Sequence, residues 1–327
     1  MKAPSYQWTR RRWIGGIAAS AAFSGCDRPR SPWAPVSIHR AAAYDDGLYG
    51  LVRRIIADHG LNVAGKRVVL KPNLVEFDEK TVINTNPKLV HAAFEAFREA
   101  GAAEVRIAEG PGHRRVTLDL ADAAGYFATV PQFESRFTDL NLDEIHSRAL
   151  ARPQSALRSL YLPGTVLGCD LLVSMPKVKT HHWAGATLSM KNLFGLVPGG
   201  VYGWPKNVLH WAGIDECIAD LHSLFPKAFS IVDGVVAMEG NGPIQGHPRQ
   251  LGVVVAGADP VAVDATCCRI MGLDPKGIRH LTLAAGEQRL QESLIPQSGE
   301  AIASVAQSFA VLPQFERIRL PVVEARP

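Results

Sequence analysis

The chain has 327 residues, of which 47% are hydrophobic and 20% charged, as expected for a globular protein with one large or two smaller domains. Its formal charge of +4 comes from residues 1–25, which hold Lys2, Arg10, Arg11 and Arg12 and no acidic residue. Without this segment the 35 basic residues fall to 31 and equal the 31 acidic residues. The remainder therefore lacks the excess positive charge of a nucleic-acid-binding protein, and we expect no nucleic acid partner.

The N-terminal segment has the pattern of an export signal. The arginines at 10–12 precede an uncharged run over 13–25, which as a helix would be about 20 Å long and too short to span a bilayer. Paired arginines before such a run are typical of a twin-arginine signal. We therefore expect a twin-arginine signal peptide over 1–25 and export of a folded protein. The alternative is a basic, poorly ordered N-terminus.

The uncharged run ends in Phe-Ser-Gly-Cys, which resembles a lipobox with Phe23 where Leu is usual. Cys26 would then carry the lipid and become the first residue of the mature protein. Asp27 favours retention in the inner membrane. The sequence thus predicts a protein anchored by lipid at the periplasmic face of the inner membrane, unless Cys26 follows the run by chance.

A proline-rich segment over 26–42 predicts an extended tether, and we expect the folded domain over 43–295. Helical spacing of apolar residues over 48–59 is followed by a strand at 67–70. A helix is expected from Pro87 to Ala100, with Pro and Gly in their favoured terminal positions, and a strand at 104–108. Such a strand–helix–strand unit forms a parallel sheet that helices cover on both faces.

The remaining elements continue this alternation. We expect strands at 138–140, 170–174, 229–233 and 251–256, and helices over 188–194, 213–225 and 259–271. The alternation predicts a three-layer α/β fold with a mostly parallel sheet and helices on both faces. Residues 296–327 are weakly patterned and are expected to form a C-terminal extension, with a last strand over 311–323.

The five cysteines do not have the spacing of a metal or cluster site. With Cys26 lipidated, Cys169, Cys217, Cys267 and Cys268 remain, and the chain has no Cys-x-x-Cys. We therefore expect no iron–sulfur cluster in this chain. A disulfide among the four is compatible with an oxidising compartment, and buried packing is the alternative.

Polar loops follow the first two predicted strands of the domain. In parallel sheets, ligands bind where the carboxyl ends of the strands meet. Lys71 and Asn73 follow the first strand, and the second leads into a glycine-containing loop with Arg114. Such a loop can expose backbone amides, and arginine can hold an anion. We assign Lys71, Asn73 and Arg114 to substrate binding, with a tight turn and solvated arginines as the alternative.

The densest set of polar residues follows the strand at 170–174. Lys177, Lys179 and His181 alternate along an extended chain and therefore point to one side. Three cations on one face would repel each other unless an anion or a metal lay between them. Because lysine can be tuned as a base and neutral histidine binds metals, we expect all three to be catalytic and His181 with His182 to ligate a divalent metal. A solvent-facing basic strand end is the alternative.

The next predicted helix adds Lys191 and Asn192, which can turn back toward the same space and are assigned to substrate binding. A later apolar helix holds Asp264, whose buried carboxylate needs a partner such as Lys177 or Lys191. The insertion over 198–212 is rich in aromatic residues and glycine and is expected to form a lid or a pocket wall. Simple surface packing of this insertion is equally compatible with its sequence.

Carboxylates complete the expected site. Asp233 ends a predicted strand, and Glu239 lies in a glycine-rich loop over 239–243. Both are expected to act as acid/base or metal-binding groups, with Asn241 in substrate binding.

Together these motifs resemble the family known as domain of unknown function 362 (DUF362). The matching segments lie at 71–73, 109–110, 176–181, 190–195, 233–234, 239–243 and 259–264, within about residues 65–275. Some members carry a ferredoxin-like domain with cysteine runs for iron–sulfur clusters. This chain has none, so the resemblance implies a member without cluster-based electron transfer of its own. The resemblance implies a fold and a site but no established reaction.

Two functions stay open. In the first, the lysine–histidine segment binds an anionic small molecule or a metal, with the cofactor and the reaction unknown and a redox association implied by the cluster-bearing relatives. In the second, a non-catalytic lipoprotein delivers a metal or cofactor to a membrane redox complex or helps to assemble it, which implies a redox partner protein. Redox chemistry at Cys169 or Cys267–Cys268 is weaker, since apolar surroundings make thiols inert.

Overall fold

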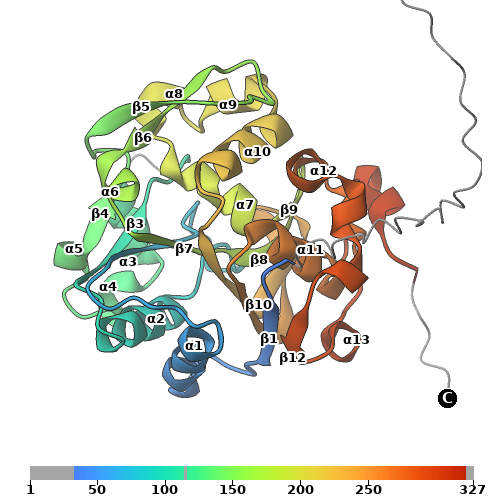
Figure 1. Cartoon of the computed structure of the whole chain (residues 1–327), viewed down its shortest axis with the longest axis horizontal. Coiled ribbons are helices and arrows are strands. Elements are labelled where there is room, and N and C mark those ends of the chain that lie inside the picture. Colours follow the sequence, from blue (N-terminus) through green and yellow to red (C-terminus); the bar gives the residue numbers. More distant parts are fainter. Residues whose placement is uncertain (1–32, 114–115, 322–327) are drawn as a thin grey trace, which may run out of the picture. The chain divides into compact units, whose positions relative to one another are not determined.

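A computed structural model describes residues 33–113 and 116–321 of the chain (Figure 1). Its strands are β1 (Val36–Arg40), β2 (Arg67–Pro72), β3 (Glu104–Glu109), β4 (Phe137–Asp139), β5 (Ile145–Ala149), β6 (Ser159–Pro163), β7 (Leu171–Met175), β8 (Lys177–His181), β9 (Gly185–Thr187), β10 (Phe229–Asn241), β11 (Gln245–Gly257) and β12 (Gln297–Gly299). The α-helices are α1 (Gly47–Asp58), α2 (Pro87–Glu99), α3 (Thr117–Ala123), α4 (Tyr126–Thr129), α5 (Phe133–Arg136), α6 (Gly164–Leu167), α7 (Ser189–Asn192), α8 (Gly199–Tyr202), α9 (Asn207–Trp211), α10 (Ile214–Leu224), α11 (Pro260–Ile270), α12 (Arg279–Ala285) and α13 (Ile302–Val305). Short 3-10 helices form at η1 (Leu193–Leu196), η2 (Pro275–Gly277), η3 (Glu287–Leu290), η4 (Glu292–Leu294) and η5 (Pro313–Ile318).

A mostly parallel sheet organises the described part of the chain. Its strands follow the order β12-β1-β11-β10-β7-β2-β3-β4, and β8 pairs with β10 and β9. The neighbours from β10 through β7, β2 and β3 to β4 are parallel, whereas β11 is antiparallel to β1 and β10. The carboxyl ends of β2, β3 and β7 therefore lie at one edge of the sheet, where ligands of such folds bind.

Helices cover both faces of this sheet (Figure 1). Neighbouring residues of a strand point to opposite faces, so Val68 and Leu70 of β2 face one core and Val69 faces the other. The first core includes buried residues of α1 and α2, and the second includes those of α10 and α11. The predicted α/β fold with a mostly parallel sheet is confirmed.

Two of the described helices, α2 and α11, begin at a side chain that caps them. The Asn86 side chain accepts a hydrogen bond from the Lys88 amide ahead of α2, and Pro87 is the first residue of that helix. Asp259 caps α11 in the same way through the amides of Val261 and Ala262.

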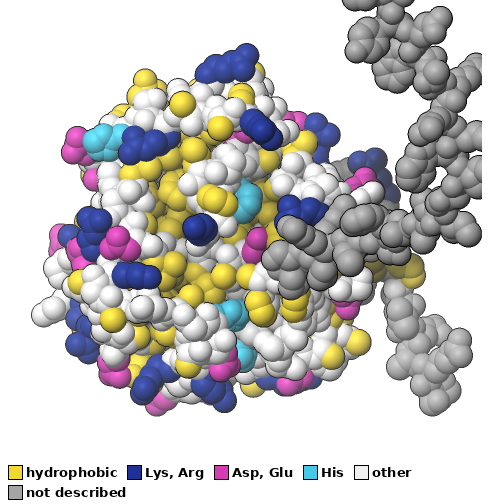
Figure 2. Space-filling view, in the orientation of Figure 1, with side chains coloured by type: hydrophobic (Ala, Val, Ile, Leu, Met, Phe, Trp, Pro, Cys, Tyr) yellow, Lys and Arg dark blue, Asp and Glu magenta, His cyan; other side chains and the backbone are white. Residues whose placement is uncertain are grey.

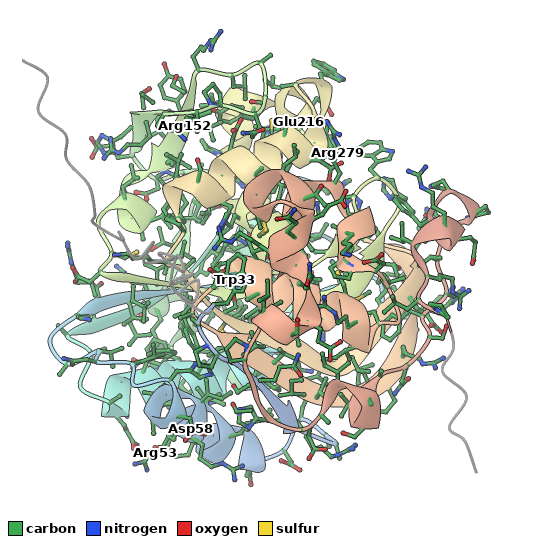
Figure 3. All side chains as sticks on the ribbon, turned by 45° about the vertical axis from the view of Figure 1, so that its right-hand side comes forward. Trp33, Arg53, Asp58, Arg152, Glu216 and Arg279 are labelled. Carbon is green, nitrogen blue, oxygen red and sulfur yellow. The ribbon has the colours of Figure 1, made fainter. Side chains whose placement is uncertain are left out.

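An ion pair joins two helices of one layer. Glu216 of α10 accepts a hydrogen bond of 2.6 Å from Arg279 of α12 (Figure 3).

The folded domain is larger than the expected range of 43–295. Strand β1 lies within the expected tether, where Val36 and Ile38 are buried and pair with β11 and β12. Strand β12 lies in the expected C-terminal extension, and Phe309 beyond it is fully buried. Each strand is too short for its apolar alternation to stand out beside prolines and polar residues, so their sheet partners decide their structure.

Two further local expectations are wrong. In the expected strand over 311–323, Pro313 begins the 3-10 helix η5, and residues 322–327 lie outside the described range. The expected glycine-rich loop after Glu239 is instead the end of a long hairpin, because β10 continues to Asn241 and pairs with β11 from Gln245 onward.

Among the described residues, no helix has the length and apolar character needed to cross a membrane. The expected signal peptide and Cys26 lie outside the described residues. Cys169, Cys217, Cys267 and Cys268 are free, and burial raises the pKa of Cys169 and of Cys217 to about 11. Raised pKa values keep thiols protonated and poorly reactive at neutral pH.

On the face shown in Figure 2, basic and acidic side chains are interspersed around the margin, and hydrophobic side chains gather nearer the centre.

Candidate functional site

A cavity of about 140 Å³ opens at the carboxyl ends of β2 and β3. Segments that are distant in sequence line it: the loops after these two strands, the end of β8, the α7–η1 turn and residues 205–210. The insertion over 198–212 thus supplies part of the pocket wall, as its aromatic and glycine content predicts. The cavity lies at the edge of the sheet where the carboxyl ends of the parallel strands meet, which is the edge that the sequence predicts for a ligand.

The floor of the cavity is a buried ion pair. Lys71, at the end of β2, donates hydrogen bonds to Glu109 Oε2 at 2.5 Å, to Asn192 Oδ1 at 3.1 Å and to the Pro72 carbonyl at 3.0 Å. Glu109 also accepts a hydrogen bond from the Gly110 amide. Both charged side chains are at most 1% exposed. The expected substrate ligand Lys71 is therefore already engaged by a carboxylate of the protein.

Two lysines of the cavity wall are held by backbone carbonyls. Lys179 donates to the carbonyls of Ile83 at 2.9 Å and Pro243 at 3.3 Å. Lys206 donates to those of Gly110 at 2.6 Å and Phe194 at 2.7 Å. Burial lowers the pKa of Lys206 to about 7 and that of Lys179 well below its usual value.

Lys191 has a different environment. Its Nζ lies 3.9 Å from the centre of the Phe194 ring, and among the described residues it has no hydrogen-bond acceptor. The side chain is partly exposed and lines the cavity. Burial, followed by the nearby charge of Lys71, lowers the pKa of Lys191 to about 7. At neutral pH this lysine therefore exchanges easily between its charged and neutral forms.

Helix α7, which carries Lys191, begins at a buried carboxylate. Asp264 of α11 accepts hydrogen bonds from the amides of Ser189 at 2.7 Å and Met190 at 2.9 Å. The expected lysine partner of Asp264 is therefore wrong, because these amides satisfy the carboxylate. Burial raises the pKa of Asp264 to about 7.

The predicted histidine pair lies at the cavity, and the hydrogen bonds of His181, unlike those of His182, do not suit a metal. Nδ1 of His181 accepts hydrogen bonds from the amides of Trp183 and Ala184, both at 3.1 Å. The neutral ring therefore carries its proton on Nε2, which makes that atom a donor rather than a metal ligand. Burial lowers the pKa of His181 well below its usual value. His182 stacks on this ring and bonds to the Gly242 carbonyl.

The described residues contain no group of three or more His, Cys, Asp or Glu side chains placed to hold a metal ion. Two polar atoms of the cavity lining, Asn73 Oδ1 and Thr187 Oγ1, have no hydrogen-bond partner among the described residues. Both are buried polar atoms that a bound molecule could satisfy. The described lining thus combines three lysines and four histidines with unpartnered polar atoms.

Other expected site residues lie away from this cavity. Lys177 and Asp233 form an ion pair of 2.7 Å, and Tyr44 donates to Asp233 at 2.8 Å. Glu239 pairs with Arg249 at 3.4 Å.

Asn73, Lys191 and Asn192 line the cavity, and Lys71 is buried behind its lining, where it bonds to Glu109 and Asn192. Asn241 is exposed and bonded to Gln245. Arg114 lies outside the described residues.

Lys206 and His210 are lining residues that sequence reasoning did not assign to the site. The only sequence signal was their place in the aromatic insertion. His210 bonds through Nδ1 to the Lys206 carbonyl, and burial lowers the pKa of His210 to about 4. Their role depends on how the insertion folds back over β3, which no local pattern shows.

The fold and this cavity define an α/β protein with a lysine- and histidine-lined pocket at the carboxyl edge of its parallel strands. A family model described as "Domain of unknown function (DUF362)" matches residues 68–269, and the chain belongs to this family. It is 30% identical over 267 residues to the thylakoid-associated protein sll1697 of Synechocystis sp., which covers 77% of this chain and 78% of the relative.

Solved structures are similar in fold. The lactate racemase apoprotein from Thermoanaerobacterium thermosaccharolyticum aligns with a TM-score of 0.46 and 14% identity, over 73% of this chain and 57% of that one. A structural-genomics protein from Thermotoga maritima aligns with a TM-score of 0.41 and 14% identity, over 64% of this chain and 54% of that one. The chain spans little more than half the length of these structures, and the likeness concerns the fold alone.

Proposed function

We propose that this protein binds a small anionic molecule in the cavity at the carboxyl ends of β2 and β3. The observation that carries the proposal is an excess of basic groups. Lys179, Lys191 and Lys206 line the cavity, whereas the carboxylate among its described lining residues, Glu109, is engaged by Lys71. Basic side chains that are close together inside a protein favour the binding of a negative charge, because the anion offsets both their repulsion and their desolvation.

The cavity limits the size of the ligand. Its volume of about 140 Å³ is close to the roughly 150 Å³ of an engineered protein cavity that holds benzene. The enclosed part of the ligand is therefore a group with about six to eight non-hydrogen atoms, by the same comparison. A carboxylate or phosphate group with a short carbon skeleton fits this limit.

Replacing Lys191 by methionine is expected to weaken anion binding by tenfold or more, since a hydrogen bond to a charged group contributes about 1.5–3 kcal/mol. Titration calorimetry with acetate, glyoxylate and inorganic phosphate measures the affinity. The matched control is Lys227→Met, because Lys227 is exposed and lies outside the cavity lining. Wild-type affinity in Lys191→Met would contradict the proposed site.

The same titration tests the alternative function. If the wild-type protein binds none of these anions but is recovered from membranes with a redox enzyme, delivery or assembly for that enzyme becomes the better account. The cavity would then bind the metal or cofactor that the protein delivers, and the proposal of a small anionic ligand would fail.

We also propose that the protein is exported by the twin-arginine route and anchored by lipid at Cys26 on the periplasmic face of the inner membrane. The arginines at 10–12, the short uncharged run and the Phe-Ser-Gly-Cys sequence support this proposal. The relative from Synechocystis sp. is named as thylakoid-associated.

Cys26→Ser is expected to move the protein from the membrane fraction to the soluble periplasm, because a lipid chain supplies the membrane affinity. Replacing the arginines at 10–12 by lysine is expected to keep the protein in the cytoplasm. Fractionation followed by immunoblotting measures both changes, with Cys169→Ser as the matched control. Membrane retention of Cys26→Ser would exclude Cys26 as the anchor.

A further inference from the structure

The lysines around the cavity differ in what holds their amino groups. Lys71 is bound by Glu109, and Lys179 and Lys206 each donate to two backbone carbonyls. Lys191 Nζ has the face of the Phe194 ring as its contact and no hydrogen-bond acceptor among the described residues. An amino group without a hydrogen-bond acceptor has no partner that stabilises its protonated form. Once it is neutral, its lone pair can attack a bound molecule.

The charged groups around Lys191 do not restore its positive charge. Glu109 is paired with Lys71, and Asp215 is bound to His280 at 2.9 Å, so neither carboxylate contacts the Lys191 amino group. Burial and Lys71 lower the pKa of Lys191 to about 7. About half of its amino groups are then neutral at pH 7, against roughly one in two to three thousand for an ordinary lysine.

We propose that Lys191 is a nucleophilic amine that forms an imine with the carbonyl group of a small anionic aldehyde or 2-oxo acid bound in the cavity. This inference rests on the proposed function, since the anionic group must first be held by the cavity wall. The hydrogen-bonded lysines, Lys179 and Lys206, are placed to attract that group, and they leave Lys191 free to react. Activation of a lysine by desolvation and by neighbouring cations is a general route to such chemistry.

The step balances without an oxidant or a reductant. The lone pair of Lys191 Nζ attacks the carbonyl carbon, and the carbonyl π electrons move to the oxygen, which takes up a proton as the nitrogen loses one. The resulting carbinolamine then loses its hydroxyl group and the second proton of the nitrogen as water, leaving a C=N bond. Thr187 Oγ1 and Asn73 Oδ1, which lack partners in the described residues, line the same cavity and can hold this hydroxyl group.

The test traps the imine. The protein is incubated at pH 7 with glyoxylate, a small anionic aldehyde, and with cyanoborohydride, which reduces the imine to a stable secondary amine. Peptide mapping then gives the initial rate of modification at each lysine. We expect Lys191 to react at least about tenfold faster than Lys227, because its lowered pKa leaves much of its amine neutral and because it lies in the anion-binding cavity. Acetate, which is anionic but has no reactive carbonyl group, should slow the modification of Lys191 and leave Lys227 unaffected.

A conservative variant separates binding from reaction. Lys191→Arg keeps a positive charge but has no amine that forms an imine under these conditions. It is expected to lose the cavity adduct while still binding acetate measurably, so that loss of the adduct does not follow from loss of the bound anion. Acetate binding by the wild type without preferential modification of Lys191 would overturn this inference and leave the proposed function intact. Failure of the wild type to bind acetate, glyoxylate or phosphate would overturn both.

Discussion

Replacing Glu109 by glutamine is expected to lower the free energy of unfolding by about 3–5 kcal/mol, the usual cost of removing one partner of a buried ion pair. The change keeps the size of the side chain, but glutamine has one carbonyl oxygen and can accept from only one of the amides of Leu74 and Gly110, which bond to different oxygens of Glu109. It leaves the charge of Lys71, which is fully buried, without a carboxylate. Urea denaturation of the full chain measures the loss.

The destabilisation should depend on pH in a defined direction. Burial lowers the pKa of Lys71, and Glu109 opposes that shift. Without Glu109 the pKa of Lys71 falls further below the value of about 10.4 that lysine has in the unfolded chain. Between these two values the unfolded state binds more protons than the folded state, so stability rises with pH. The stability of Glu109→Gln should therefore recover toward pH 10 more steeply than that of the wild type.

Two controls isolate the buried pair. Glu300→Gln makes the same chemical change in a pair with Arg40 that is largely exposed, and it should cost less than about 1 kcal/mol. The double variant Lys71→Met/Glu109→Gln removes both charges and should recover most of the loss. A stability within about 1 kcal/mol of wild type for Glu109→Gln alone would contradict the pairing.

The position of this pair follows from the sequence, but its partners do not. Lys71 and Glu109 end two predicted neighbouring strands, and the carboxyl-edge rule places them close together. The register of β2 against β3 brings the Lys71 side chain into contact with that of Glu109, so that the two bind each other rather than a ligand. Gly195 is a further constraint that only the structure reveals, because a Cβ there would collide with Glu109 and Lys71. Side-chain pairing of this kind depends on atomic positions that periodicity does not encode.

Strand β8 shows where the alternation rule fails. It places Lys177, Lys179 and His181 on one side of an extended chain, yet Lys179 and His181 line the cavity and Lys177 does not. The cause is an irregularity in β10, where Asp233 lies opposite Lys177 but Met238 lies opposite Lys179. Extra residues on one strand bend the pair and turn successive side chains toward different surroundings.

The insertion over 198–212 marks the other limit. Its composition indicates a lid or wall, and the structure places it against the cavity. Which of its side chains enters the cavity depends on the hydrogen bonds of Lys206 to carbonyls after β3 and in η1. These contacts join Lys206 to residues that lie about a hundred and about ten positions earlier in the chain. A single sequence gives no signal for such contacts.

Replacing Asp233 by asparagine is expected to destabilise the fold by about 3–5 kcal/mol while leaving the anion affinity of the folded protein unchanged within about twofold. Asp233 accepts hydrogen bonds from Lys177 at 2.7 Å, from Tyr44 at 2.8 Å and from the Asn86 amide at 2.9 Å. Lys177 and Asp233 have side-chain exposures of 2% and 0%, and neither lines the cavity. The network joins β8, β10 and the start of α2, so its loss should act on stability rather than on ligand binding.

The measurement pairs urea denaturation with acetate titration at a temperature where the variant remains folded. Asp170→Asn is the matched control, because Asp170 pairs with Arg67 at 3.5 Å with both side chains exposed, and it should cost less than about 1 kcal/mol. Tyr44→Phe removes three hydrogen bonds of the same network, one donated to Asp233 and two accepted from Lys177 and the Val236 amide, and should cost about 1–3 kcal/mol. A folded, stable Asp233→Asn protein that no longer binds acetate would instead make Asp233 part of the ligand site, as its place at the end of the predicted strand over 229–233 indicated. It would move that site from the cavity toward β10, which continues past Asp233 to Asn241.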